Sequence, residues 1–333
     1  MNEQILVDTA LKMVKKGKGI LAADESTPTA GSRLQSIGVE SSFDTRNEYR
    51  DMLFTAKRME EYISGVILFD ETLKQSTTCS DKIPFVKLLN DKDVIPGIKV
   101  DTGAKELAAF PGEKITEGLD GLRERLKAYF SIGARFAKWR AVITINDNIP
   151  SDSCILANAH ALARYASLCQ ESNIVPIVEP EVLMNGSHTI EKCYEVTDKT
   201  LNIVFEQLNI FNVMLEGIVL KPNMIISGLD CSEQADVDKV SDMTVKCLKS
   251  NVPENVPGIA FLSGGQSSDL ATEHLNSMNK KYLNSMPWNL TFSYGRALQA
   301  DALKGWNGND RELGQENLMK RAEANSLATK GLA

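Results

Sequence analysis

Eight short apolar runs, spaced regularly along the 333 residues, are the feature that most restricts the fold of this chain. Each run ends in glycine or polar residues, and successive runs begin between 31 and 46 residues apart. Near-continuous apolarity is typical of buried parallel strands, and this spacing leaves room for a crossover helix after each strand. Eight such units predict an α/β fold, a closed TIM (β/α)8 barrel. The runs lie at residues 19–26, 65–71, 96–103, 134–140, 175–181, 217–223, 258–265 and 290–295.

Amphipathic segments between these runs predict the helices of the barrel. Residues 153–170 carry their apolar side chains on one stripe, and residues 200–215 do the same. A polar C-terminal segment, about 311–333, is expected to contain a final helix over residues 311–329. Because no linker-like stretch divides the chain, residues 1–333 are interpreted as a single domain.

Charge, cysteine and histidine content narrow the class of protein. A net charge of -7 argues against a nucleic-acid surface, so a site for a phosphorylated metabolite would need its own cluster of lysine and arginine. The six cysteines form no CxxC pair, and the three histidines lack metal-ligand spacing. No signal peptide or membrane span is evident. We therefore expect a cytoplasmic protein with reduced thiols, no metal and no membrane or nucleic-acid partner.

Lys221 closes the run at residues 217–223 and is followed at once by Pro222 and Asn223. A strand that ends in lysine places the amine at the rim of a buried core, where desolvation favours the neutral form. A neutral lysine amine attacks carbonyl carbons and can form a Schiff base with a ketone or an aldehyde. Lys221 is therefore the candidate nucleophile.

Polar side chains close most of the other runs as well. The carboxyl ends of parallel barrel strands meet at one mouth, so these residues should converge there. Lys138 and Arg140 are two residues apart, as are Glu179 and Glu181, so each pair can face one side of its strand. A structural ring of ion pairs is the alternative interpretation. The full set at the strand ends is Asp24, Lys99, Lys138, Arg140, Glu179, Glu181, Lys221, Ser263 and Arg296.

Two glycine-containing motifs follow the last two runs. LSGGQ (262–266) places a hydroxyl and two glycines after a strand, which lets backbone N–H groups approach a phosphate. SYGR (293–296) adds a glycine and an arginine, and the loops after strands seven and eight of such barrels often bind phosphate. LSGGQ also matches the signature of ABC-type ATPases, but the GxxxxGK[ST] loop that they require is missing from this sequence. We therefore predict a phosphate cup.

Seven motifs in order, GILAADEST, GIKVD, FAKWR, VPIVEPE, LKPN, LSGGQ and SYGRALQA, resemble those of the class I fructose-bisphosphate aldolases over nearly the whole chain. The resemblance implies a metal-independent lyase without a cofactor, usually a cytosolic homotetramer. Such an enzyme reversibly cleaves fructose 1,6-bisphosphate to dihydroxyacetone phosphate and glyceraldehyde 3-phosphate, in glycolysis and gluconeogenesis, through a lysine Schiff base. A cytoskeletal partner is a further expectation from this family.

The resemblance also implies roles for individual residues. Lys221 would form the iminium with the ketose C2 carbonyl, and Lys138 would help to keep its amine neutral. Glu179 would act as the general acid and base, with Glu181 beside it, and Asp24 would accept the proton of the C4 hydroxyl. The cup for the C1 phosphate would comprise Ser263, Gly264, Gly265, Ser293, Gly295 and Arg296. The contacts near the other end would be Ser26, Arg33, Lys99 and Arg140.

The sequence departs from the family pattern in two places. The family typically has a lysine–arginine pair where this chain has Ser32 and Arg33, so one cation near the C6 phosphate is replaced by serine. This change bears on the preference between fructose 1,6-bisphosphate and fructose 1-phosphate. Animal members also place a C-terminal tyrosine in the site, whereas the last tyrosine here is Tyr294. Another group, such as Glu179, is then expected to exchange the enamine proton.

Two other functions remain open on the sequence alone. A different Schiff-base lyase or a transaldolase-like enzyme would need one phosphate site rather than two, and equal kcat/KM for mono- and bisphosphate ketoses would favour it. A non-catalytic binding scaffold would keep its cellular role after Lys221→Met.

Overall fold

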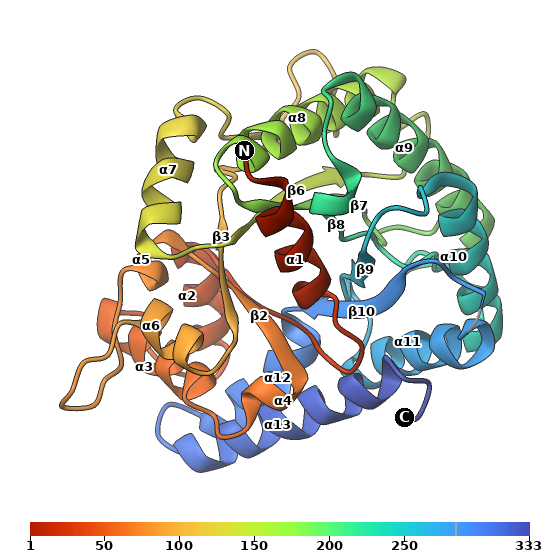
Figure 1. The fold of residues 1–333 in the computed structure, drawn as a ribbon. Helices are drawn as coiled ribbons and strands as arrows, with labels where there is room; N and C mark the ends of the chain where they lie inside the picture. Colours follow the sequence, from red (N-terminus) through yellow and green to blue (C-terminus); the bar gives the residue numbers. More distant parts are fainter. Residues whose placement is uncertain (284) are drawn as a thin grey trace.

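The computed structural model describes residues 1–283 and 285–333 and contains a closed barrel of eight parallel strands (Figure 1). The strands follow one another around the barrel in chain order, and the last pairs with the first, with Ile20 opposite Ser293. The prediction of a TIM barrel in a single domain is confirmed. The barrel strands are β1 (Gly19–Ala23), β2 (Ile63–Leu68), β3 (Ile95–Lys99), β6 (Phe136–Ile143), β7 (Val175–Val182), β8 (Val219–Leu220), β9 (Gly258–Phe261) and β10 (Asn289–Tyr294).

Helices surround the barrel and cover its outer face (Figure 1). Seven of the eight strands are followed by at least one helix of seven residues or more before the next barrel strand, and two helices follow β10. The helices are α1 (Glu3–Met13), α2 (Thr27–Gln35), α3 (Phe43–Phe54), α4 (Met59–Tyr62), α5 (Asp70–Leu73), α6 (Phe85–Asp91), α7 (Leu122–Ile132), α8 (Asp152–Glu171), α9 (Ile190–Ile210), α10 (Val237–Asn251), α11 (Ser268–Tyr282), α12 (Arg296–Trp306) and α13 (Arg311–Ala328).

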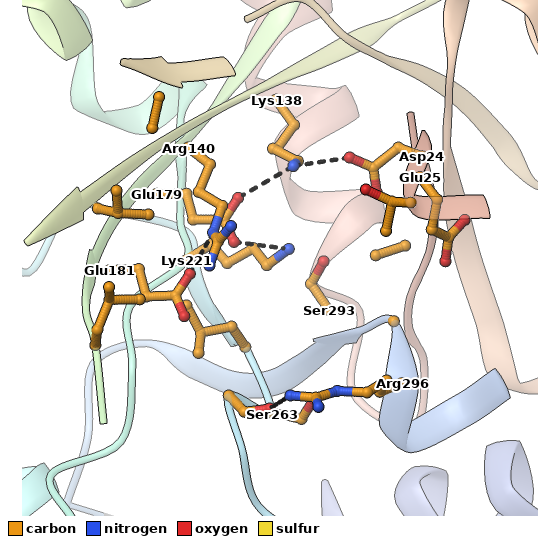
Figure 2. Close-up of a pocket in the computed structure, with 18 of the residues that line it drawn as sticks. Asp24, Glu25, Lys138, Arg140, Glu179, Glu181, Lys221, Ser263, Ser293 and Arg296 are labelled. Atoms are coloured by element: carbon orange, nitrogen blue, oxygen red, sulfur yellow. Dashed lines mark hydrogen bonds and ion pairs between the residues drawn. The ribbon is translucent and has the colours of Figure 1, made fainter. Parts of the chain in front are cut away.

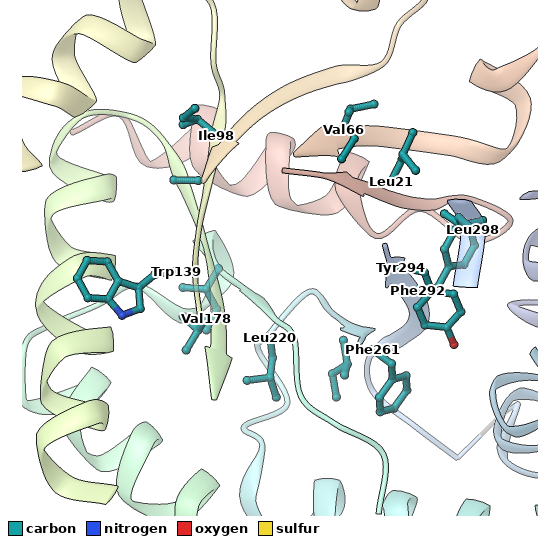
Figure 3. Packing of buried hydrophobic residues seen from close by; sticks show 14 of the residues in the cluster. Leu21, Val66, Ile98, Trp139, Val178, Leu220, Phe261, Phe292, Tyr294 and Leu298 are labelled. Carbon is teal, nitrogen blue, oxygen red and sulfur yellow. The ribbon is translucent and has the colours of Figure 1, made fainter. Parts of the chain in front are cut away.

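Alternate side chains of each barrel strand point in two directions, outward to the helices or into the barrel. Trp139 of β6 packs outward against Tyr165 of α8, with ring centroids 5.6 Å apart. Val178, Leu220 and Phe292 belong to the same buried layer between the strands and the helices (Figure 3). Because side chains alternate along a strand, the residues next to these point into the barrel. This alternation directs the polar strand ends to the inside.

The amino-terminal end of the barrel is filled with apolar side chains. Phe136 lies inside the barrel, so close to Gly97 and Gly65 that a Cβ at either glycine would collide with its ring. Helix α1 contributes Leu6 and Met13 to the same cluster and lies across this end of the barrel (Figure 1). Access to the barrel interior is therefore left to the opposite, carboxyl end.

Three features differ from the sequence interpretation. The helix expected at 200–215 is α9, which begins at Ile190 because the side chain of Thr189 caps its first turn, and ends at Ile210. Asn212 then takes a left-handed backbone conformation (φ 50°), and Leu215–Gly217 forms a short 3-10 helix. A hairpin of β4 (Gly103–Glu106) and β5 (Lys114–Glu117) after β3 was not anticipated.

None of the described helices is long and apolar enough to cross a membrane.

Candidate active site

The carboxyl ends of the strands surround one pocket of about 540 Å³, shown in Figure 2. All fifteen site residues proposed from the sequence line this pocket. They lie in or after every barrel strand except β2, which explains how positions spread over most of the chain meet. They are Asp24, Ser26, Arg33, Lys99, Lys138, Arg140, Glu179, Glu181, Lys221, Ser263, Gly264, Gly265, Ser293, Gly295 and Arg296.

Lys221 and Glu179 form a buried pair at the centre of the pocket. The register of β7 and β8 places Val178 beside Leu220, so the next residues along each strand, Glu179 and Lys221, lie side by side. The backbone N–H of Lys221 donates to the Val178 carbonyl at 2.8 Å. Lys221 Nζ lies 3.1 Å from Glu179 Oε1, and both residues are only 3% exposed. The amine is thus held within proton-transfer distance of a carboxylate.

Lys138 links this pair to Asp24 (Figure 2). Its Nζ lies 2.7 Å from Asp24 Oδ2 and 3.6 Å from Glu179 Oε2. Burial by itself raises the pKa of Asp24, but the charges of Lys138 and Lys221 outweigh it and lower that pKa from 3.8 to about 2. Burial lowers the pKa of Lys138, but Asp24 and Glu179 more than offset it, so this pKa lies above its ordinary value. Asp24 is therefore a carboxylate, and Lys138 an ammonium, at neutral pH.

Two further ion pairs line the side of the pocket formed by β3, β6 and β7. Arg140 pairs with Glu181 through its Nε, and Glu181 is buried while Arg140 reaches the rim. Lys99 Nζ donates to the side chain of Asp101 at 2.5 Å and to its carbonyl at 2.9 Å. Asp101 was not among the sequence candidates, although it stands two residues after Lys99 and strand parity could have identified it. Each carboxylate fixes the direction of a cation at the pocket edge.

Glu25 is the second residue that the sequence interpretation missed. Its carboxylate accepts from Arg33, which lines the pocket, and from Arg50 of α3, which does not. Gln299 of α12 donates to the same carboxylate at 3.0 Å. Glu25 stands between Asp24 and Ser26 in the first apolar run, so its position was a usable signal. Arg50 and Gln299 lie far away in the chain, and no local pattern points to them.

The loop after β9 forms a cup of backbone groups. Gly264 has a φ of 56°, a conformation that glycine adopts without a steric cost. A Cβ at Gly265 would lie 2.7 Å from the sulfur of Met184, so a side chain there would require Met184 to move. Arg296 Nη2 donates to the Gly264 carbonyl at 2.7 Å. Ser293 also lines this pocket, and its buried Oγ finds no hydrogen-bond partner in the described part of the chain.

This fold and site define a class of protein. A barrel enzyme that holds a buried lysine amine against a carboxylate, with flanking cations and a glycine cup, is suited to covalent chemistry on a phosphorylated carbonyl compound. Among residues 1–283 and 285–333, no group of three or more His, Cys, Asp and Glu side chains is placed to hold a metal ion.

Comparison with known proteins agrees with this class. The family model described as "Fructose-bisphosphate aldolase class-I" matches residues 5–332. A "Probable fructose-bisphosphate aldolase class 1" of Xanthomonas campestris is 54% identical over 335 aligned positions, which cover 99% of each chain. The "Fructose-bisphosphate aldolase" of Plasmodium falciparum is 49% identical and is covered over 88% of its length.

A solved structure is similar over the same length. It is the fructose-bisphosphate aldolase from Plasmodium falciparum in complex with TRAP and a small-molecule inhibitor, with a TM-score of 0.96 and 49% identity. The match covers 99% of this chain and 95% of that one. The chain belongs to the class I fructose-bisphosphate aldolase family, whose members are Schiff-base, metal-independent lyases of glycolysis.

Proposed function

We propose that Lys221 is the nucleophile with which this class I aldolase cleaves fructose 1,6-bisphosphate. The amine attacks the C2 carbonyl to give a carbinolamine, and loss of water then gives an iminium whose carbon accepts electrons. The observation that carries this proposal is the buried contact of 3.1 Å between Lys221 Nζ and Glu179 Oε1. Glu179 takes the proton that the ammonium must lose before attack, and returns a proton to the departing hydroxyl as the carbinolamine dehydrates.

Asp24 serves as the base for bond cleavage in this proposal. It accepts the proton of the C4 hydroxyl, the C3–C4 bond breaks, and the bonding electrons move into the iminium to form an enamine. Glyceraldehyde 3-phosphate leaves as the aldehyde. A proton then returns to C3, and water hydrolyses the iminium to release dihydroxyacetone phosphate. The lowered pKa of Asp24 supports this role, because the group is ionised and ready to accept a proton at neutral pH.

The two ends of the pocket bind the two phosphates in this proposal. Ser263, Gly264, Gly265, Ser293, Gly295 and Arg296 bind the C1 phosphate, while Ser26, Arg33, Lys99 and Arg140 contact the other end. Ser32 is not among the residues that line the pocket, and its hydroxyl donates to Pro28 of its own helix at 3.1 Å. The far phosphate would thus depend on Arg33, Lys99 and Arg140. Comparing kcat/KM for fructose 1,6-bisphosphate and fructose 1-phosphate measures how much these cations contribute.

The nucleophile is tested by trapping the iminium. Borohydride reduction in the presence of dihydroxyacetone phosphate, followed by peptide mapping, should attach the three-carbon unit to Lys221. The Lys221→Met variant should acquire no label under the same conditions. Label on Lys138 in the parent enzyme would overturn the assignment, because that lysine lines the same pocket.

We further propose that the protein acts in the cytoplasm as a homotetramer and needs no metal or cofactor. Family membership supports each of these statements. A protein partner of the cytoskeletal kind is also proposed from the family resemblance. The Plasmodium falciparum aldolase in complex with TRAP supports it only in showing that a similar chain binds another protein.

A further inference from the structure

Gln266 and His274 form a chain of hydrogen bonds that ends on the phosphate-cup loop, residues 263–265. Gln266 follows the loop, and its Nε2 donates to the Ser263 carbonyl at 3.0 Å. Its Oε1 lies 2.5 Å from Nδ1 of His274, a residue of α11. The side chain of Gln266 therefore connects the backbone of the cup to a helix that lies outside the barrel.

The chemistry of this contact fixes the state of His274. An amide oxygen can only accept, so Nδ1 must carry the hydrogen. His274 is 2% exposed, and burial lowers its pKa from 6.5 to about 4, which keeps the ring neutral at physiological pH. Nε2 has no partner among the residues that the structure describes. Among the described residues, the one hydrogen bond of this ring is therefore the bond to Gln266, the residue that contacts the cup.

Arg296, which lines the pocket, also contacts this loop. Arg296 Nη2 donates to the Gly264 carbonyl at 2.7 Å, but Arg296 is exposed and is assigned to the C1 phosphate. A bound phosphate would compete with Gly264 for this guanidinium. Neither Gln266 nor His274 is among the residues that line the pocket, so a bound phosphate would leave their hydrogen bonds in place. Because two adjacent glycines lose much backbone freedom on ordering, a bond that persists during binding lowers the cost of forming the cup.

We propose that His274 is a positioning residue that acts through Gln266 to hold the Ser263–Gly265 backbone in its phosphate-binding conformation. It sets the affinity of the enzyme for the C1 phosphate without contacting substrate. This inference rests on the assignment of the cup under the proposed function. It predicts that replacing His274 changes the affinity for phosphate and KM but leaves the chemical steps at Lys221 unaltered.

The test compares two substitutions at the same position. His274→Leu keeps similar bulk but removes the donor, whereas His274→Asn keeps an N–H donor on the atom attached to Cγ, where histidine has Nδ1. We expect His274→Leu to weaken binding of inorganic phosphate, measured by calorimetry, and to raise KM by about tenfold, equivalent to about 1.4 kcal/mol. At saturating substrate, kcat should stay within about twofold. His274→Asn should stay close to the parent in both measurements.

Gln266→Met provides a second route to the same answer if His274→Leu folds poorly. It removes both hydrogen bonds at similar length, so it should raise KM as much, and the double variant should be no worse than either single one. Unchanged phosphate affinity in His274→Leu and Gln266→Met would overturn the proposal, as would an equal loss in His274→Asn and His274→Leu. Borohydride labelling of Lys221 at saturating dihydroxyacetone phosphate should persist in every variant. Loss of labelling in the parent would instead refute the proposed function.

Discussion

Glu179 shares its two carboxylate oxygens between two lysines, and this sharing distinguishes their roles. Oε1 faces Lys221 at 3.1 Å, while Oε2 faces Lys138 at 3.6 Å. Lys138 also has a closer carboxylate, Asp24, at 2.7 Å and therefore holds its proton firmly. Lys221 has Glu179 as its one ion-pair partner among the described residues. Glu179 is thus the carboxylate that lies against the proposed nucleophile, while Lys138 lies closer to Asp24.

Replacing Glu179 tests this arrangement. Glu179→Gln keeps the shape of the side chain but removes the basic oxygen, so we expect kcat to fall by about 100-fold or more. KM should change by a few-fold at most, because proton transfer acts mainly in transition states. Steady-state kinetics on fructose 1,6-bisphosphate gives both values. Glu171→Gln, at an exposed ion pair with Arg123, is the matched control and should behave as the parent; a Glu179→Gln enzyme with the kcat of this control would refute the role.

Individual site residues were predictable where a local signal existed. Lys138, Glu179 and Lys221 could be found because each one interrupts an apolar run. Arg50 could not be found in this way, because its importance arises from a contact with Glu25, a residue of another element. A charge on a helix looks the same in a sequence whether it is solvated or paired.

Among the elements, strands were more predictable than helix limits. The eight apolar runs marked the barrel strands well, since burial on both faces requires apolar residues whatever the neighbours are. Helix α9 begins ten residues before its predicted start; its first half is capped by Thr189 and buries Ile190, Cys193 and Val196, a stripe interrupted by many polar residues. The hairpin β4–β5 is short and mostly exposed or half-buried, so it leaves no clear apolar pattern.

Helix α11 provides a prediction at this scale because it buries a neutral histidine. The pKa of His274 is about 4 in the folded protein against 6.5 when it is free. Below pH 6.5, His274 binds a proton in the unfolded chain but stays neutral in the folded protein. Its contribution therefore lowers the free energy of unfolding as pH falls from 6.5 to 4. Between pH 7 and pH 5 the loss should be about 2 kcal/mol.

Urea unfolding of the parent and of His274→Asn at both pH values isolates this contribution. The variant lacks the titrating ring, so it should lose about 2 kcal/mol less on acidification than the parent does. If both proteins lose the same amount, His274 is not neutral and buried in solution as the structure describes.

At the scale of the whole molecule, all fifteen proposed site residues line one pocket and belong to one chain. If the protein is the homotetramer that we propose, sedimentation should give a particle of four times the chain mass of 36.6 kDa. On dilution into smaller species, kcat per chain should stay constant, because every proposed site residue belongs to the same chain. Loss of activity in parallel with dissociation would show that the site needs a neighbouring subunit.

The sequence by itself determined the number and order of the strands, the buried lysine that we propose as the nucleophile, and most of the polar residues that line the pocket. These properties are local, because the pattern of apolar and polar side chains along a few consecutive residues predicts which strands are buried and which side chains share a face. The tertiary structure decided the pairings: Lys221 with Glu179, Glu25 with Arg50, and Gln266 with His274. Such pairings depend on strand register, barrel closure and the packing of helices from distant parts of the chain. No short stretch of sequence contains that information, since each contact joins elements whose relative position is set by the fold as a whole.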